Sequence, residues 1–144
     1  MEVINERAAL LSNAEVFSLL ETLKSDLKES KYSQRLNKNE KEKGKERLNT
    51  IVYETFKYLE EMPCASQSEE SIKNFLIAIA PYELTKAEKL QLLNLQPKSL
   101  VEIQLLIEEC EERFTEDQMN DILNVVAETL SSSTENEEGS YEEN

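Results

Sequence analysis

The spacing of the apolar residues constrains the fold of this 144-residue chain more than any other feature. Apolar side chains recur every three or four residues, which places them on one face of an α-helix. No run alternates cleanly with period two over strand length, although residues 2–10 could extend as an added strand on a partner. We therefore predict an all-α fold with six apolar stripes: Val16, Leu19, Leu20, Leu23 and Leu27; Leu48, Ile51, Val52, Thr55, Phe56 and Leu59; Ile72, Phe75, Leu76 and Ile79; Ala87, Leu90 and Leu93; Ile103, Leu106, Ile107 and Cys110; Met119, Ile122, Leu123 and Val126.

The starts of several helices are marked by capping boxes. In this motif a Ser or Thr precedes a Glu or Gln by three residues, and each side chain satisfies a backbone N–H of the other. The motif predicts helix starts at four pairs: Ser12 with Glu15, Thr85 with Glu88, Ser99 with Glu102, and Thr115 with Gln118. Prolines mark the helix ends and turns between these segments, at Pro63, Pro81 and Pro97.

The stripes and the composition between them suggest three parts. Residues 1–64 form an N-terminal pair of helices joined by a mobile basic loop over 31–47, where few apolar groups compensate the entropy of ordering. Residues 65–130 form a compact four-helix module. Residues 131–144 are polar and acidic without an apolar stripe, which is typical of a disordered tail.

Composition argues against a self-contained enzyme. The chain has no histidine, two glycines and two cysteines, which excludes histidine acid–base chemistry, a glycine-rich phosphate loop and a His-containing zinc site. We predict no catalytic residue, no cofactor and no metal ligand. Glu108, Glu109, Glu111 and Glu112 are interpreted as a solvated helix face, Cys110 as a buried apolar position, and Cys64 as a loop residue that could be exposed.

The net charge of −14 is unevenly distributed. Residues 99–144 contain fourteen acidic residues and one basic residue, whereas residues 31–47 contain seven basic and three acidic residues. The basic loop lacks interleaved aromatics, so direct contact with nucleic acid is expected to be weak or indirect. No apolar run approaches 18 residues and no secretory segment follows Met1, so we expect a soluble intracellular protein without membrane contact.

The two N-terminal helices carry more apolar surface than one stripe requires. Phe56 fits the inner face of the second helix with Val52 and Leu59, while Tyr53 and Tyr58 cannot share that face because adjacent positions differ by about 100°. Such a helical pair could dock on itself, on the C-terminal module or on another chain, and we favour another chain.

Four segments resemble one protein family over residues 8–127: ALLSNAEVFSLL at 9–20, LNTIVYETFKYLEEMPC at 48–64, LTKAEKLQLLN at 84–94, and PKSLVEIQLLIEECEERFTEDQ at 97–118. The family is that of the ninth subunit of RNA polymerase III, also called the calcitonin-gene-related-peptide receptor component. It is the counterpart of the fourth subunit of RNA polymerase II and of the archaeal F subunit. The basic loop and the acidic tail lie outside the resemblance.

The resemblance implies a non-catalytic, nuclear subunit with a C-terminal helicase-and-RNase-D-like (HRDC-like) module. Family members form a heterodimer with a larger subunit that contains an oligonucleotide-binding fold. This pair makes the polymerase stalk and supports transcription initiation through contacts with the polymerase core and initiation factors. The matching segments imply a set of partner-contact residues: Leu10, Leu11, Val16, Phe17, Leu20, Tyr53 and Phe56.

Other functions stay open at this point. The second family name suggests an adaptor that couples a peptide-hormone receptor to signalling, and the chain could equally be the corresponding stalk subunit of RNA polymerase II. An independent nucleic-acid-binding module is a further alternative, which the acidic character of residues 68–130 disfavours.

Overall fold

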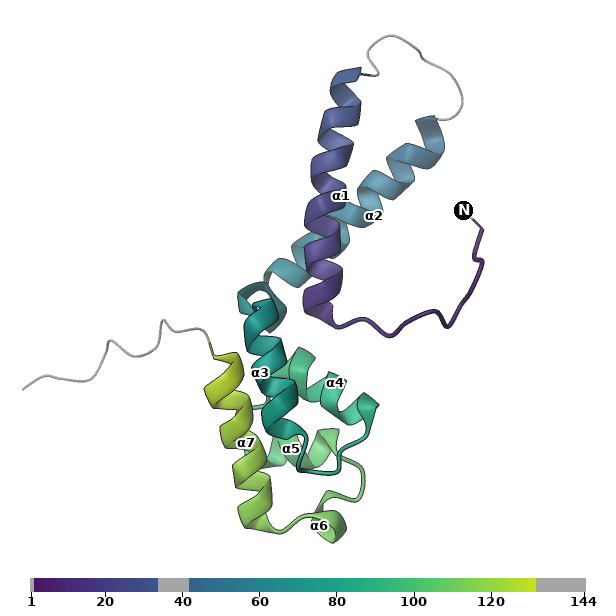
Figure 1. The fold of residues 1–144 in the computed structure, drawn as a ribbon. Coiled ribbons are helices and arrows are strands. Elements are labelled where there is room, and N and C mark those ends of the chain that lie inside the picture. Colours follow the sequence, from purple (N-terminus) through teal and green to yellow (C-terminus); the bar gives the residue numbers. More distant parts are fainter. Residues whose placement is uncertain (1, 34–41, 132–144) are drawn as a thin grey trace, which may run out of the picture. The chain divides into compact units, whose positions relative to one another are not determined.

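The computed structural model describes residues 2–33 and 42–131, with side chains for residues 2–26 and 47–131. Every regular element within these residues is helical, which confirms the predicted all-α class (Figure 1). The elements are α1 (Asn13–Ser33), α2 (Glu42–Glu60), a 3₁₀ turn (Pro63–Ser66), α3 (Glu69–Ile79), α4 (Lys86–Leu95), α5 (Leu100–Leu106), α6 (Cys110–Arg113) and α7 (Glu116–Leu130).

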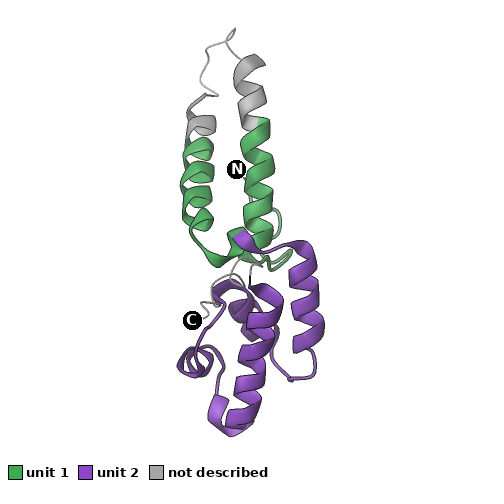
Figure 2. Ribbon diagram, turned by 90° about the vertical axis from the view of Figure 1, so that its left-hand side faces the viewer, with its two compact units in different colours: residues 1–65 green, residues 66–144 purple. Residues whose placement is uncertain are grey.

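The chain divides into two compact units, residues 1–65 and 66–144 (Figure 2). In the first unit, α1 and α2 pack along each other in opposite directions. In the second unit, α3 packs on α7, and α4 and α5 complete the core. The core side chains that are inaccessible to solvent are Phe75, Ile79, Leu92, Ile103 and Ile122.

The predicted capping boxes are present and explain where these helices begin. The Thr85 N–H donates to Glu88 Oε2 at 2.8 Å, and the Glu88 N–H donates to Thr85 Oγ1 at 3.2 Å. Equivalent reciprocal bonds join Ser99 with Glu102 at α5 and Thr115 with Gln118 at α7. Ser12 and Glu15 make the same pair at the start of α1. The local spacing of side chains is therefore sufficient to start these helices.

The second unit differs from the predicted four-helix module in one connection. The stripe that begins at Ile103 does not form one helix, because α5 ends at Leu106 and the separate turn α6 begins at Cys110. Between them, Glu109 adopts a left-handed backbone conformation with φ of 51°. Helix α5 ends because its C-cap residue, Ile107, has an extended backbone with φ of −107° and ψ of 123°, and Glu109 then directly precedes α6. Two predicted stripe residues, Leu76 and Ala87, are exposed.

The loop predicted over residues 31–47 is helical at both ends. Helix α1 continues to Ser33 and α2 begins at Glu42, so the prediction was wrong for those residues. The middle of the predicted loop, residues 34–41, lies outside the described residues. The predicted acidic tail also lies outside them, apart from Ser131.

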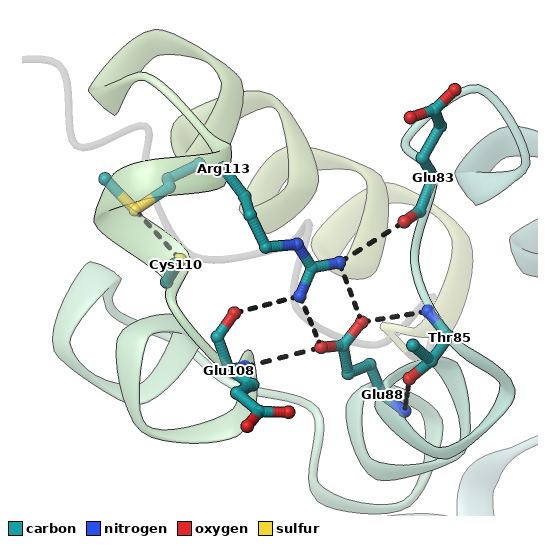
Figure 3. Close-up of polar contacts among 7 residues, drawn as sticks. Glu83, Thr85, Glu88, Glu108, Cys110 and Arg113 are labelled. Atoms are coloured by element: carbon teal, nitrogen blue, oxygen red, sulfur yellow. Dashed lines mark hydrogen bonds and ion pairs between the residues drawn. The ribbon is translucent and has the colours of Figure 1, made fainter.

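An ion pair between α4 and α6 connects three segments of the second unit (Figure 3). Arg113 binds both carboxylate oxygens of Glu88, with Nη1 to Oε1 at 2.6 Å and Nη2 to Oε2 at 3.2 Å. The same guanidinium donates to the carbonyl oxygens of Glu108 at 2.9 Å and Glu83 at 3.3 Å. Two parallel bonds to one carboxylate give this contact a defined geometry, so Arg113 ties the break after α5 to the start of α4.

Glu88 occupies a largely solvent-free position, with its side chain 8% exposed. Its carboxylate accepts hydrogen bonds from Arg113 and from the backbone N–H groups of Thr85 and Glu108. These contacts favour the charged form, and they lower the pKa of Glu88 to about 2, with the Arg113 hydrogen bond as the largest cause. The only basic residue among residues 99–144 is therefore directed onto a carboxylate of its own unit.

Candidate partner-binding surface

The first unit is held together by a short apolar seam between α1 and α2. Leu20, Val52 and Leu59 are at most 8% exposed and form its centre. The rings of Phe17 and Phe56 stack beside them, with centroids 4.9 Å apart and planes inclined by 16°. The Lys24 ammonium lies 3.9 Å from the centroid of the Phe56 ring. Stacking and the cation–π contact add directional attraction to the burial of apolar area.

The predicted partner-contact residues fall into three groups of exposure. Leu10, Leu11 and Tyr53 are exposed, at 72%, 47% and 54%. Val16 and Phe17 are partly buried. Leu20 and Phe56 are 8% and 9% exposed, which places them within the seam. The structure therefore brings Phe17, Leu20 and Phe56 together inside the unit, and leaves Leu10, Leu11 and Tyr53 available to another molecule.

The structure also exposes apolar residues outside that predicted set. In the first unit, the largest exposed fractions outside that set belong to residues before α1, with Val3 at 66% and Ile4 at 97%. Four more lie on the two helices: Leu19 at 51%, Leu48 at 40%, Ile51 at 63% and Tyr58 at 62%. The sequence held a signal for Leu48 and Ile51, because their spacing from Tyr58 repeats that of a helix face. Helical spacing by itself does not show whether such apolar side chains pack inside the protein or remain on its surface.

Other side chains that sequence analysis singled out do not converge on a site. Glu108, Glu109, Glu111 and Glu112 are exposed as predicted. Cys110 is buried as predicted, with its Sγ 3.3 Å from Met119 Sδ. Cys64, for which the sequence left exposure open, is only 1% exposed and donates to the Leu59 carbonyl oxygen at 3.3 Å. Burial raises the pKa of the Cys64 thiol, so the reactive thiolate is disfavoured.

Within residues 2–33 and 42–131, no three carboxylate or cysteine side chains are grouped to hold a metal ion. No helix in the described part of the chain has the length and apolar character needed to cross a membrane.

These features define an all-helical protein with a separately packed helical unit and a two-helix unit that exposes apolar side chains. The chain belongs to the RNA polymerase Rpb4 family, whose model matches residues 10–130. The predicted family resemblance is thereby confirmed.

Named relatives point to one branch of this family. The chain is 35% identical over 124 residues to DNA-directed RNA polymerase III subunit rpc9 of Schizosaccharomyces pombe. This alignment covers 81% of the present chain and 89% of the relative. It is 28% identical over 159 aligned positions to the subunit RPC9 of Saccharomyces cerevisiae, covering 88% and 98%. The Dictyostelium discoideum rpc9 subunit is 36% identical over 73 residues, covering 46% and 56%.

Proposed function

We propose that this chain is a non-catalytic accessory subunit of DNA-directed RNA polymerase III, acting in the nucleus. It forms the polymerase stalk as a heterodimer with a subunit that contains an oligonucleotide-binding fold, and it supports transcription initiation. The family match and the polymerase III names of the relatives support this assignment over the RNA polymerase II stalk. No observation favours the receptor-coupling adaptor.

The exposed apolar side chains of the first unit carry the heterodimer part of the proposal. Leu10 and Leu11 are 72% and 47% exposed, and Ile51 on α2 is 63% exposed. Leaving these groups in water forgoes the favourable free energy of burial, and several exposed apolar side chains in one small unit are typical of a protein–protein contact. In this arrangement the seam residues Phe17, Leu20 and Phe56 position the two helices, while the exposed residues contact the partner.

The second unit supplies an acidic surface for initiation factors or neighbouring polymerase subunits. Its carboxylates at Glu108, Glu109, Glu111 and Glu112 are exposed, and Arg113 is engaged by Glu88. Exposed negative charge attracts basic protein surfaces and repels nucleic-acid phosphates. We therefore assign RNA contact to the partner subunit and protein contact to this chain.

Co-expression with the partner subunit tests the proposal. The wild-type chain should co-purify with it as a 1:1 complex, and the double variant Leu10→Asp/Leu11→Asp should bind at least about tenfold more weakly. Leu105→Asp is the matched control, because Leu105 is 80% exposed in the second unit and should leave the complex intact. A wild-type chain that does not bind the partner would contradict the heterodimer.

A second measurement tests the polymerase assignment. The chain should be tagged in cells of its own source and purified, and the large subunits that accompany it should be identified by mass spectrometry. Polymerase III subunits are expected. Recovery of polymerase II subunits in their place would refute the proposed branch while leaving the stalk function intact.

A further inference from the structure

The two helices of the first unit present exposed apolar residues along one flank of α2. Leu48, Ile51 and Tyr58 lie three and seven positions apart, and Thr55 fits the same series. At about 100° per residue, Ile51 and Tyr58 are displaced by roughly a quarter to a third of a turn from the buried stripe of Val52 and Leu59, and Leu48 borders that stripe. The three apolar side chains remain 40–63% exposed, so α1 does not cover this flank.

Helix α1 carries a matching flank. Val16, Leu19 and Leu23 are spaced by three and four residues. Leu19 is 51% exposed, while Val16 and Leu23 are partly buried toward the seam. Viewed from the first residue of α1, the apolar flank lies anticlockwise of the buried stripe. The same is true of α2 when it is viewed from its own first residue.

The two flanks therefore lie on the same side of the helical pair. Helices α1 and α2 lie side by side and run in opposite directions (Figure 1, Figure 2). For antiparallel helices that face each other, equal rotational offsets bring two flanks to one side of the pair. We call the surface formed by Leu19, Leu48, Ile51 and Tyr58 the apolar face.

The opposite side of the pair is polar. Tyr53 is five positions from Tyr58, which corresponds to about 140° around α2. Lys57 and Glu60 accompany Tyr53 on that side and form an exposed ion pair of 3.4 Å. On α1, Glu21 and Ser25 have the corresponding rotational position and are exposed. The helical pair thus has one apolar face and one polar face, with the predicted contact residue Tyr53 on the polar one.

We propose that the apolar face, and not the surface around Tyr53, is the docking surface for the heterodimer partner. This inference rests on the proposed function and specifies which side of the helical pair the partner covers. Four side chains that are about half exposed present apolar area on the order of 300–400 Å². A standard interface buries about 800 Å² on each partner, so the apolar face has the extent of its central, dehydrated part.

The charged residues around the apolar face favour binding of a different chain over binding of a second copy of this chain. Glu15 and Asp26 lie beside the apolar flank of α1, and Glu54 and Arg47 lie beside that of α2, all exposed. Among the residues whose side chains are described, three acidic groups and one basic group frame the apolar face, so two copies would bring like charges together. The matching partner has an apolar centre with a mainly basic rim.

The test measures binding of the full chain to the partner subunit. Leu19→Asp/Ile51→Asp should weaken the complex by at least about thirtyfold, because two charges would enter the dehydrated centre. Tyr53→Asp on the polar face is the matched control and should change the dissociation constant by less than about threefold. Helical content by circular dichroism shows that the variants are folded, and Ile51→Ser/Tyr58→Ser repeats the test without adding charge.

Each outcome separates this inference from the proposed function. A wild-type chain that binds the partner, combined with full affinity in both apolar-face variants, would overturn the inference alone. Loss of binding with Tyr53→Asp would place the partner on the polar face and also overturn it. A stable dimer of the chain alone that Leu19→Asp/Ile51→Asp dissociates would make a second copy the occupant. A wild-type chain that does not bind the partner would refute the proposed heterodimer itself.

Discussion

Replacing Glu88 by glutamine tests how much the α4–α6 connection contributes to the second unit. Glutamine keeps an oxygen that can accept from the Thr85 N–H, and Gln118 already plays this part at Thr115, with a bond of 2.9 Å. The substitution removes the negative charge that binds Arg113 through two bonds. It therefore keeps the capping box and removes the acceptor at Oε1, which binds Arg113 and the Glu108 N–H.

The expected loss of stability follows from the pKa of Glu88. Folding lowers this pKa from 4.5 to about 2, and one pKa unit is equivalent to about 1.4 kcal/mol. The complete change would amount to about 3 kcal/mol, but the Arg113 side chain is 29% exposed and water screens part of the attraction. We expect Glu88→Gln to lower the free energy of unfolding by about 1–2 kcal/mol at pH 7.

Amide hydrogen exchange assigns this loss to the second unit. Helix α7 contains the buried residues Ile122, Val126 and Leu130, so its central amides exchange only when the core opens. Exchange there should accelerate about 5–30-fold in Glu88→Gln. Glu102→Gln is the matched control, because Glu102 occupies the same capping-box position in α5 and lacks an arginine partner.

The effect should depend on pH with a defined sign. The folded-state pKa of Glu88 lies below its unfolded value, so the stabilisation is complete above about pH 5 and disappears as the pH falls from 4.5 toward 2. Urea unfolding at pH 7 and pH 3 should show the difference between wild type and Glu88→Gln shrinking at the lower pH. A difference that is absent at pH 7, or that is equal at both pH values, would refute this account of the ion pair.

Two further pairs of substitutions have expected effects on stability. Gln96→Gly should raise the free energy of unfolding by about 0.5–1 kcal/mol, because Gln96 ends α4 with φ of 44°, where glycine has no steric penalty. Gln91→Gly inside α4 should instead lower it by about 1 kcal/mol, and chemical denaturation compares the two. Phe17→Ala should lower the stability of the α1–α2 pair by about 2 kcal/mol through loss of the stack on Phe56. Tyr53→Ala, measured by exchange of the α2 amides, should change it by less than about 0.5 kcal/mol, and equal effects of Phe17→Ala and Tyr53→Ala would contradict the stacked seam.

Much of the local structure could be read from the sequence because its causes are local. A capping box joins groups three residues apart, so Thr85 with Glu88 and Thr115 with Gln118 predicted the starts of α4 and α7 correctly. The inward position of Phe56 followed from the phase it shares with Val52 and Leu59. The same reasoning missed the break after Leu106, where the apolar phase continues although the backbone of Ile107 is extended.

The candidate surface was only partly predictable for a different reason. A helical stripe reports which side chains share a face, but the seam of the first unit depends on which parts of α1 and α2 meet. Phe17, Leu20 and Phe56 were predicted to contact a partner, whereas their burial and stacking place them between the two helices. Ile51 and Tyr58 were left exposed by the same packing.

The sequence alone determined the all-α class, most helix starts and the membership of a polymerase subunit family, because these depend on periodicity, short-range caps and similarity along the chain. The tertiary structure determined which residues far apart in the chain contact one another. Arg113 meets Glu88 across 25 positions, and the polar and apolar faces of the first unit exist only once α1 and α2 are paired. Such contacts depend on the relative placement of whole helices, which the local spacing of residues does not encode.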